Sequence, residues 1–342
     1  MTLEESLTNY NANHQVDGIP FTRHSHGLYW TDDDNALYAG IQLGAMAYRY
    51  AASPSPDKLD AVRRSLRGIS LLTTVTGTRG VLVRRVMHNS LATKFGLTHP
   101  LTKENYWYDK PIEFRAGYNY LLKTTKDQVT GVLFGLSACR KLLWGVDAQI
   151  DDSVTTIIRD LYNAISERKF SLRDHNWRTH GTSAHLLDAP LRLNLEALAH
   201  SVGHIEDKPA HSWFNHVGLF TIHYNTIVQN AYSHGLNAVT AHSLDLLDAY
   251  HEDGDGVKQW MHKINWVIES EHNPFWELLL NGATTEGGDE RLDALADEPY
   301  TRFFVWNKYR AEITQRELTT GPQIDYMVAG FMRAYHQSKD IS

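Results

Sequence analysis

Two sets of acidic residues stand immediately before long apolar stretches of the sequence. Asp32, Asp33 and Asp34 precede a stretch that runs to Ala52, and Asp127 precedes a second one. Glycoside hydrolysis needs two carboxyl groups, one protonated to assist the leaving oxygen and one ionised to activate water or attack the sugar. Clustered carboxylates repel one another, so that one can stay protonated and serve as the acid. The alternative for each aspartate is structural: it caps the helix that follows.

Aromatic residues accompany the acidic ones and could form the walls of a sugar site. Trp30 closely precedes the first acidic cluster, and Trp107 and Tyr108 lie between the two acidic sets. Trp177 follows further along the chain. Aromatic rings present flat apolar faces, which suit stacking on a sugar ring, so we predict substrate-binding roles for these four residues.

Segments with helical periodicity make up most of the chain and must position these side chains. The predicted helices lie within 31–52, 58–74, 124–143, 151–167, 189–203, 211–229, 233–250, 257–270 and 324–336. Residues 77–123 lack this periodicity and predict a long irregular or small β insertion, in which 81–86 could form one strand of a hairpin.

A loose repeat runs through these helices. A helix of small and apolar residues, apolar on all sides and therefore buried, is followed by an amphipathic one. The spacing of Gly40 and Gly44 in the first apolar helix matches that of Gly131 and Gly135 in the second. The pattern predicts an all-α fold, a single domain over residues 1–342 that forms an (α/α) toroid of about five to six helical hairpins.

Composition narrows the classes of partner and the compartment. The 342 residues carry a formal charge of −7 with no basic block, which disfavours a nucleic-acid partner. Neither a signal peptide nor an uncharged apolar window of about 18 residues is present, so we expect no membrane partner and a cytoplasmic location by default. Cys139 is the only cysteine, and it cannot form an internal disulfide.

The 19 histidines include His200 and His204, which are four residues apart. The spacings of the histidines favour no metal site, and we expect no metal and no cofactor.

Two openings of apolar helices carry a resemblance to a known group of proteins. They are Trp30-Thr-Asp-Asp-Asp-Asn35 and Lys126-Asp127-Gln128, each followed by glycine-rich apolar turns and separated by the long aromatic loop. With these features the chain resembles the six-hairpin (α/α) toroid superfamily of carbohydrate-active enzymes. The resemblance implies that loops before the inner helices surround the active site and that carboxylates there act as general acid and base. By this analogy the roles fall on Asp32, Asp33, Asp34 and Asp127.

A second polar segment, 173–185, offers the groups that a polysaccharide lyase needs. Such an enzyme must neutralise a uronate carboxylate and remove the C5 proton. The candidates of suitable type are His175, Asn176, Tyr106 or Tyr108, and Arg178, and Arg79, Arg84, Arg85 and His88 could also contact an acidic glycan. No spacing rule singles out these residues, and a polar loop between helices, whose histidines satisfy backbone groups, is the preferred explanation for them.

These observations lead to one main expectation and two alternatives. We expect a glycoside hydrolase whose acid/base pair is Asp34 and Asp127, with Asp33 and His175 as further catalytic candidates. The substrate site would include Trp30, Trp107, Tyr108, Asn176, Trp177, Arg178 and Arg85, and the partner would be a carbohydrate, neutral or acidic. The alternatives are a lyase acting on an acidic glycan and a non-catalytic glycan-binding or assembly protein. The sequence sets no oligomeric state.

Overall fold

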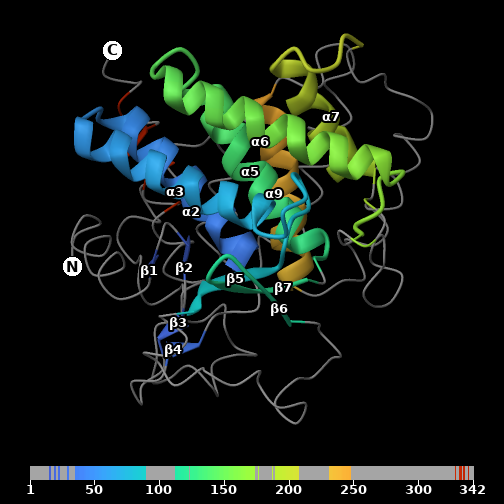
Figure 1. Cartoon of the computed structure of the whole chain (residues 1–342). Helices are drawn as coiled ribbons and strands as arrows, with labels where there is room; N and C mark the ends of the chain where they lie inside the picture. The colour runs from blue at the N-terminus through green and yellow to red at the C-terminus, as the bar shows by residue number, and fades with distance from the viewer. Residues whose placement is uncertain are drawn as a thin grey trace.

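The structure is a computed structural model of the chain, and it is mostly helical where it is described (Figure 1). It describes residues 35–89, 112–122, 124–173, 189–207 and 231–247, the backbone of 15–16, 19–20, 22–23 and 29–30, and single residues 176, 187, 328, 331, 332, 334, 335 and 338. The helices predicted within 211–229 and 257–270, and most of the one within 324–336, lie outside these residues.

Six helices occupy segments that the sequence predicts as helical. They are α2 (Asn35–Ala52), α3 (Pro56–Thr74), α5 (Lys126–Leu142), α6 (Ala148–Glu167), α7 (Ala189–Ser201) and α9 (Ala231–Leu246). The start of α3 follows from Ser55, whose hydroxyl accepts a hydrogen bond from the N–H of Lys58, and from proline at the first helical position. The predominantly helical character expected from the sequence is confirmed.

Helices α2 and α5 touch through their backbones. A Cβ atom built on Gly40 would overlap the backbone of Gly131, and one built on Gly135 would overlap the carbonyl oxygen of Gly40. A Cβ on Gly131 would overlap the carbonyl of Leu37, and one on Gly44 would overlap the ring of Phe134. The two matched glycine pairs therefore face one another, and the absence of a side chain lets the two helices approach this closely.

The same contacts show that α2 and α5 are parallel. Leu37 lies beside Gly131 and Gly40 beside Gly135, so residue numbers rise together along the two helices. All residues of α2 from Asn35 to Tyr48 are buried, as are those of α5 from Gln128 to Cys139. Both helices are therefore inner helices, as their uniformly apolar sequences predict.

We expect Gly131→Ala to destabilise the protein more than Gly44→Ala does. The new methyl group of Gly131→Ala meets the backbone of Leu37, whereas that of Gly44→Ala meets the side chain of Phe134, which can move. Overpacking of this kind costs about 1–3 kcal/mol, and the better helix propensity of alanine returns only about 1 kcal/mol. Urea denaturation of the two variants would measure the difference, and an equal loss of stability would contradict the backbone contact.

A third helix, α7, runs in the same direction as α5, and α6 runs in the opposite direction. The hydroxyl of Ser137 in α5 hydrogen-bonds Asn194 in α7 at 3.3 Å, and Arg140 further along α5 donates to the carbonyl of Ser201, further along α7. Between α6 and α7 the order reverses, since Asn163 pairs with His204, and Phe170, just after α6, stacks under Arg192. Helices α5, α6 and α7 thus alternate in direction along the chain.

An ion pair ties the first half of α3 to the start of α6. Asp147 is the N-cap of α6, where it accepts a hydrogen bond from the N–H of Ile150 at 3.0 Å. Its other carboxylate oxygen lies 2.6 Å from a guanidinium nitrogen of Arg63. The hydrogen bond from Arg63 is the main reason that the pKa of Asp147 lies below its ordinary value. Near its far end α6 meets the segment just after α3, at Gly80, so α3 and α6 are also parallel to each other.

We expect Asp147→Asn to cause a small loss of stability at neutral pH that disappears in acid. Asparagine still accepts the capping hydrogen bond, so the variant removes chiefly the pairing with Arg63. Because the pKa of Asp147 is lowered in the folded state, its contribution is present above the unfolded value, about 3.9, and is lost as the pH falls through the folded pKa.

Denaturation of Asp147→Asn and wild type between pH 7 and pH 2 would measure this effect. Asp152→Asn serves as the control, because Asp152 is exposed on the same helix. A difference from wild type that persists unchanged at pH 2 would contradict the assignment.

Buried hydrogen bonds also link the helices. The amide of Gln42 in α2 donates to the hydroxyl of Ser65 in α3 at 3.0 Å. Near the end of α2, the hydroxyl of Tyr48 lies 2.7 Å from Nε2 of His242 in α9, and both side chains are buried. Burial raises the pKa of Tyr48 far above its ordinary value, so the tyrosine is neutral and the pair is a hydrogen bond between helices.

A three-stranded antiparallel sheet interrupts the helices where the sequence predicts an insertion. Strands β5 (Arg85–His88), β6 (Ile112–Arg115) and β7 (Tyr118–Leu121) are ordered β5-β7-β6. The turn between β6 and β7 uses Ala116 and Gly117, both with positive φ, as a tight hairpin requires. Four further strands of two residues each form two hairpins: β1 (Gln15–Val16) with β2 (Ile19–Pro20), and β3 (Thr22–Arg23) with β4 (Tyr29–Trp30). The small β insertion is confirmed, although β5 begins at Arg85 rather than at Val81.

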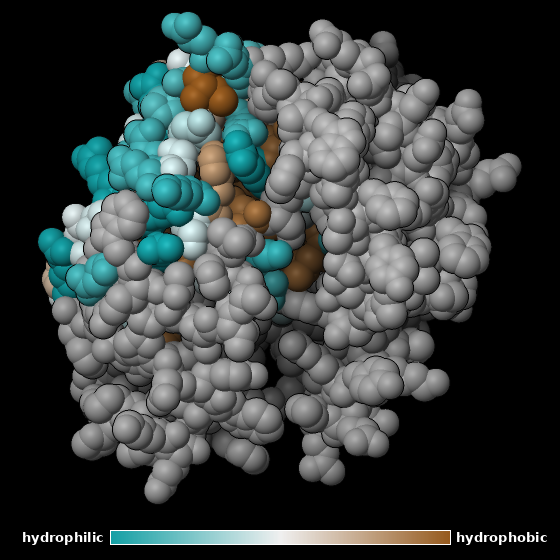
Figure 2. Space-filling view, turned by 90° about the vertical axis from the view of Figure 1, so that its right-hand side faces the viewer, coloured by the Kyte–Doolittle hydropathy of each residue, from teal (hydrophilic) through white to brown (hydrophobic). Residues whose placement is uncertain are grey.

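Among the described residues on the face shown in Figure 2, most are hydrophilic, and hydrophobic ones appear in a few places between them. Trp144 and Val146, in the turn between α5 and α6, are the large hydrophobic residues exposed within the described part, and Arg140 stacks on the ring of Trp144 at 4.0 Å. Among the described helices, none combines the length and the apolar character that a membrane crossing requires.

Candidate functional site

Asp127, one of the predicted site residues, lies at the shared N-terminal end of α2 and α5. Helix α2 begins at Asn35, directly after the acidic cluster in the sequence, and Asp127 is the second residue of α5. Because the two helices are parallel and in contact, their N-termini lie at the same end of the pair. Asn35 is buried and Asp127 is half-buried. The packing of α2 on α5 therefore places Asn35, the residue that follows Asp34, at the same end of the helix pair as Asp127.

Asp127 is not the residue that caps α5. The N-cap is Thr125, and its backbone N–H donates to Oε1 of Gln128 at 2.8 Å, as in a capping box. The interpretation of Asp127 as a helix cap is therefore wrong. Its carboxylate occupies the first turn, where a negative charge interacts favourably with the helix dipole.

Arg84 connects the starts of both helices. Its carbonyl oxygen accepts a hydrogen bond from the N–H of Ala36, in the first turn of α2, at 3.2 Å. Its guanidinium lies 3.2 Å from Oε1 of Gln128 and 3.4 Å from the hydroxyl of Thr125, the two capping residues of α5. Its backbone N–H donates to the carbonyl of Leu121, at the end of β7. One residue thus connects two helix starts and the end of the central strand β7.

We expect Arg84→Met to destabilise the start of α5. The variant removes hydrogen bonds between a charged donor and two capping residues, which typically contribute about 1.5–3 kcal/mol. Amide hydrogen exchange in the first two turns of α5, together with urea denaturation, would measure the effect. Arg79→Met is the matched control, because the side chain of Arg79 is 76% exposed. Equal behaviour of the two variants would contradict the connecting role of Arg84.

The electrostatics of this end favour an ionised carboxylate at Asp127. The positive ends of both helix dipoles lie at this end of the pair. An ionised carboxylate in a first turn suits a general base or a nucleophile, and the proton donor of a hydrolase would then come from a different carboxyl group.

The remaining predicted site residues divide into three groups. Arg85 is only 5% exposed, in β5, so its burial argues against the predicted contact with a glycan. Asn176 lies exposed in a turn, and Trp30 lies in β4, paired with Thr22. The others lie outside the described residues: Asp32, Asp33, Asp34, Trp107, Tyr108, His175, Trp177 and Arg178.

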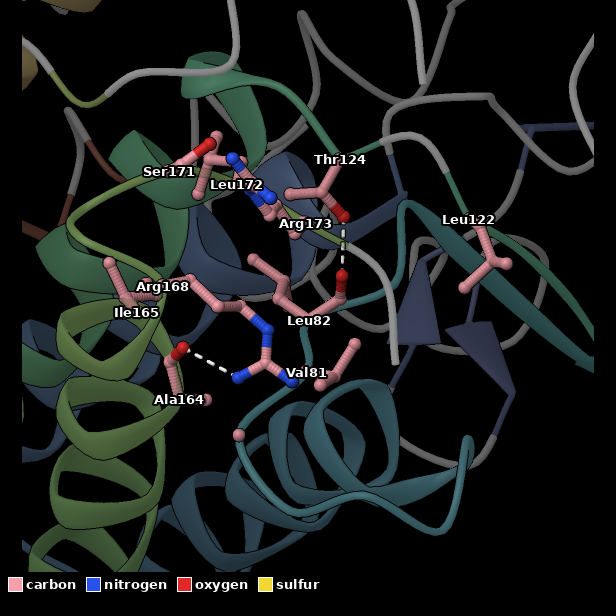
Figure 3. Close-up of a pocket in the computed structure, with 11 residues that line it drawn as sticks. Val81, Leu82, Leu122, Thr124, Ala164, Ile165, Arg168, Ser171, Leu172 and Arg173 are labelled. Carbon is pink, nitrogen blue, oxygen red and sulfur yellow. Dashed lines mark hydrogen bonds between the residues drawn. The ribbon is translucent and has the colours of Figure 1, made fainter. Parts of the chain in front are cut away.

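A cavity that the sequence does not reveal lies between the end of α6 and the segment that precedes β5 (Figure 3). Its volume is about 30 Å³, and its polar lining comes from Thr124, Arg168, Ser171 and Arg173. A small-molecule pocket usually measures several hundred Å³, so this cavity is too small to hold a sugar ring. It is separate from Asp127, which does not line it.

The described part of the chain contains neither a reactive thiol nor a metal site. Burial raises the pKa of the Cys139 thiol far above its ordinary value, which leaves it without a reactive thiolate. No group of three or more histidine, cysteine, aspartate or glutamate side chains converges there in a way that could hold a metal ion.

Comparisons with family models, with curated proteins and with solved structures found no match. The function is therefore argued from the site itself.

Proposed function

We propose that the chain is a carbohydrate-active enzyme, a glycoside hydrolase whose active site lies at the shared N-terminal end of α2 and α5. The parallel contact of these helices carries the proposal, because Asn35, which follows the acidic cluster in the sequence, and Asp127 lie at the same end of the helix pair although they are more than ninety residues apart. A pair of carboxyl groups at one end of a helical scaffold is what glycoside hydrolysis requires.

The proposed architecture is an (α/α) toroid. Two successive hairpins, α2 with α3 and α5 with α6, have parallel inner helices and parallel outer helices, and α7 continues the direction of the inner ones. Such repetition supports a closed ring in which all inner helices begin at the same end. In a ring of this kind the loops before the inner helices surround the substrate.

Within this proposal Asp127 is the base and the acidic cluster supplies the acid. Asp127 lies in the first turn of α5, where the helix dipole favours a negative charge. Asp34 is the proposed proton donor, with Asp33 as its neighbour, because adjacent carboxylates favour a shared proton. Trp30 precedes this cluster and would provide a flat face for the sugar ring.

We expect Asp127→Asn to abolish hydrolysis while the free energy of unfolding changes little. The amide cannot act as a base, and the start of α5 depends on Thr125 and Gln128 instead. Asp57→Asn is the matched control, because Asp57 also follows its N-cap by two positions, at the start of the outer helix α3. The assay is incubation with neutral and acidic polysaccharides, read for new reducing ends and for the absorbance of unsaturated uronates.

Reducing ends that appear without absorbance, and that vanish in Asp127→Asn but persist in Asp57→Asn, would support the hydrolase. Both signals together would indicate a lyase and direct attention to His175 and Asn176. A stable Asp127→Asn variant with full activity would overturn the assignment of the base.

A further inference from the structure

The turn between α5 and α6 presents an aromatic ring on the surface of the protein. Trp144 is 43% exposed and lies two residues after the end of α5. Figure 1 shows this turn, at the start of α6, on the side of the molecule away from β5, β6 and β7. Asp127 lies at the other end of α5, which has 17 residues and is about 25 Å long at about 1.5 Å per residue. The ring is therefore remote from the proposed active site.

The ring of Trp144 is held in a fixed position by Arg140. The guanidinium carbon of Arg140 lies over the ring, 4.0 Å from its centroid. Two nitrogens of the same guanidinium donate to the carbonyl of Ser201 in α7, at 3.1 and 2.9 Å. The cation covers one face of the indole and holds it by a cation–π interaction. A ring that is already fixed loses little conformational entropy when a ligand stacks on it.

Polar groups flank the exposed ring. The N–H of Gly145, the residue after Trp144, donates to Oδ2 of Asp151 at 3.0 Å, which holds that carboxylate against the turn. In the described part of the structure, neither Oδ1 of Asp151 nor the indole N–H of Trp144 makes a hydrogen bond. A Cβ atom built on Gly145 would meet nothing within 4 Å, so the outer side of the turn is open. A donor and an acceptor thus accompany an aromatic surface.

The size of this surface limits the kind of partner. Trp144 and Val146 are the large hydrophobic residues exposed within the described ranges, and their exposed neighbours Gly145, Ala148 and Gln149 are small or polar. A stable protein interface covers about 800 Å² on each partner around an apolar centre, which is far more than one ring supplies.

A single sugar unit matches the surface better. A pyranose ring has a face of C–H groups that can stack on an indole, and its hydroxyl groups can pair with the indole N–H and with Asp151. The negative charge of Asp151 disfavours a uronate carboxylate at the same place. These features favour an uncharged sugar.

We propose that Trp144 is a second carbohydrate-binding platform, on which one pyranose unit of a neutral polysaccharide stacks. The choice of a carbohydrate rests on the proposed function. Because the platform lies at the end of α5 opposite to Asp127, it would hold a long chain on the protein without taking part in the chemistry. A trisaccharide is too short to reach from one place to the other.

Native electrophoresis in gels that contain β-glucan, xylan, starch, galactomannan or polygalacturonate tests the proposal. We expect at least one neutral polysaccharide to retard the full-length protein, both as wild type and as Asp127→Asn, which does not degrade the gel. Trp144→Ala should weaken the apparent affinity about three- to tenfold, because the stacking surface is lost. Trp144→Tyr should keep most of the affinity, because tyrosine also offers an aromatic face.

Val146→Ala is the matched control, because Val146 is 45% exposed in the same turn and is not aromatic. It should bind as wild type does. An equal loss of affinity in Val146→Ala and Trp144→Ala would indicate a wider apolar surface of the kind that binds proteins, and would overturn the proposal. Unchanged retardation in Trp144→Ala, no retardation in any gel, or retardation by polygalacturonate alone would also overturn it.

The assay of reducing ends separates this proposal from that of the hydrolase. Trp144→Ala should release reducing ends from a trisaccharide as fast as wild type does, and more slowly from the retarding polysaccharide. Retardation that depends on Trp144, in a protein that hydrolyses nothing, would support the platform and remove the hydrolase. Hydrolysis without such retardation would remove the platform and leave the hydrolase.

Discussion

The close approach of α2 and α5 is the constraint on which the rest of the described structure depends. Glycines on both helices bring backbone against backbone, so the spacing of the helices is set by main-chain atoms that have no alternative rotamers. Both N-termini are thereby held at one end, where Arg84 bonds to each of them. The outer helices α3 and α6 are then joined across the same repeat by Arg63 and Asp147.

Much of this scaffold could be predicted because its determinants are local. The sequence predicts the helices nearly where the structure has them. The determinants are the apolar periodicity, the N-cap at Ser55 and the glycine and proline residues in the turns. The glycine spacing indicates thin helices, yet which helices meet through their glycines is a matter of tertiary packing. The contribution of Arg84 depends on partners more than forty residues away in the sequence, and no local pattern contains that information.

The candidate site likewise combines features that the sequence predicts with features that only the tertiary packing determines. Asp127 is recognisable from its position before an apolar helix, but the choice of Thr125 rather than Asp127 as the N-cap requires the geometry of the first turn. Arg85 looks like a surface cation in the sequence, but it is buried in the structure. The sequence could not predict this burial, because a strand of four residues is too short for its alternation to show which side chains face the core. In the sequence Arg168 has the position of an ordinary basic residue at a helix end, whereas the structure buries it in the lining of the cavity.

The glycine contact also restricts which sequences can share this fold. A larger residue at Gly40 or Gly131 on either helix would separate the pair, and no single compensating change on the partner can remove a main-chain carbonyl. Glycine must therefore be kept at both of these positions wherever the two helices keep this contact. A pair of glycine motifs in two apolar segments, each preceded by acidic residues and separated by a β insertion, would be a sensitive signature for distant relatives of this chain, even where overall identity has faded.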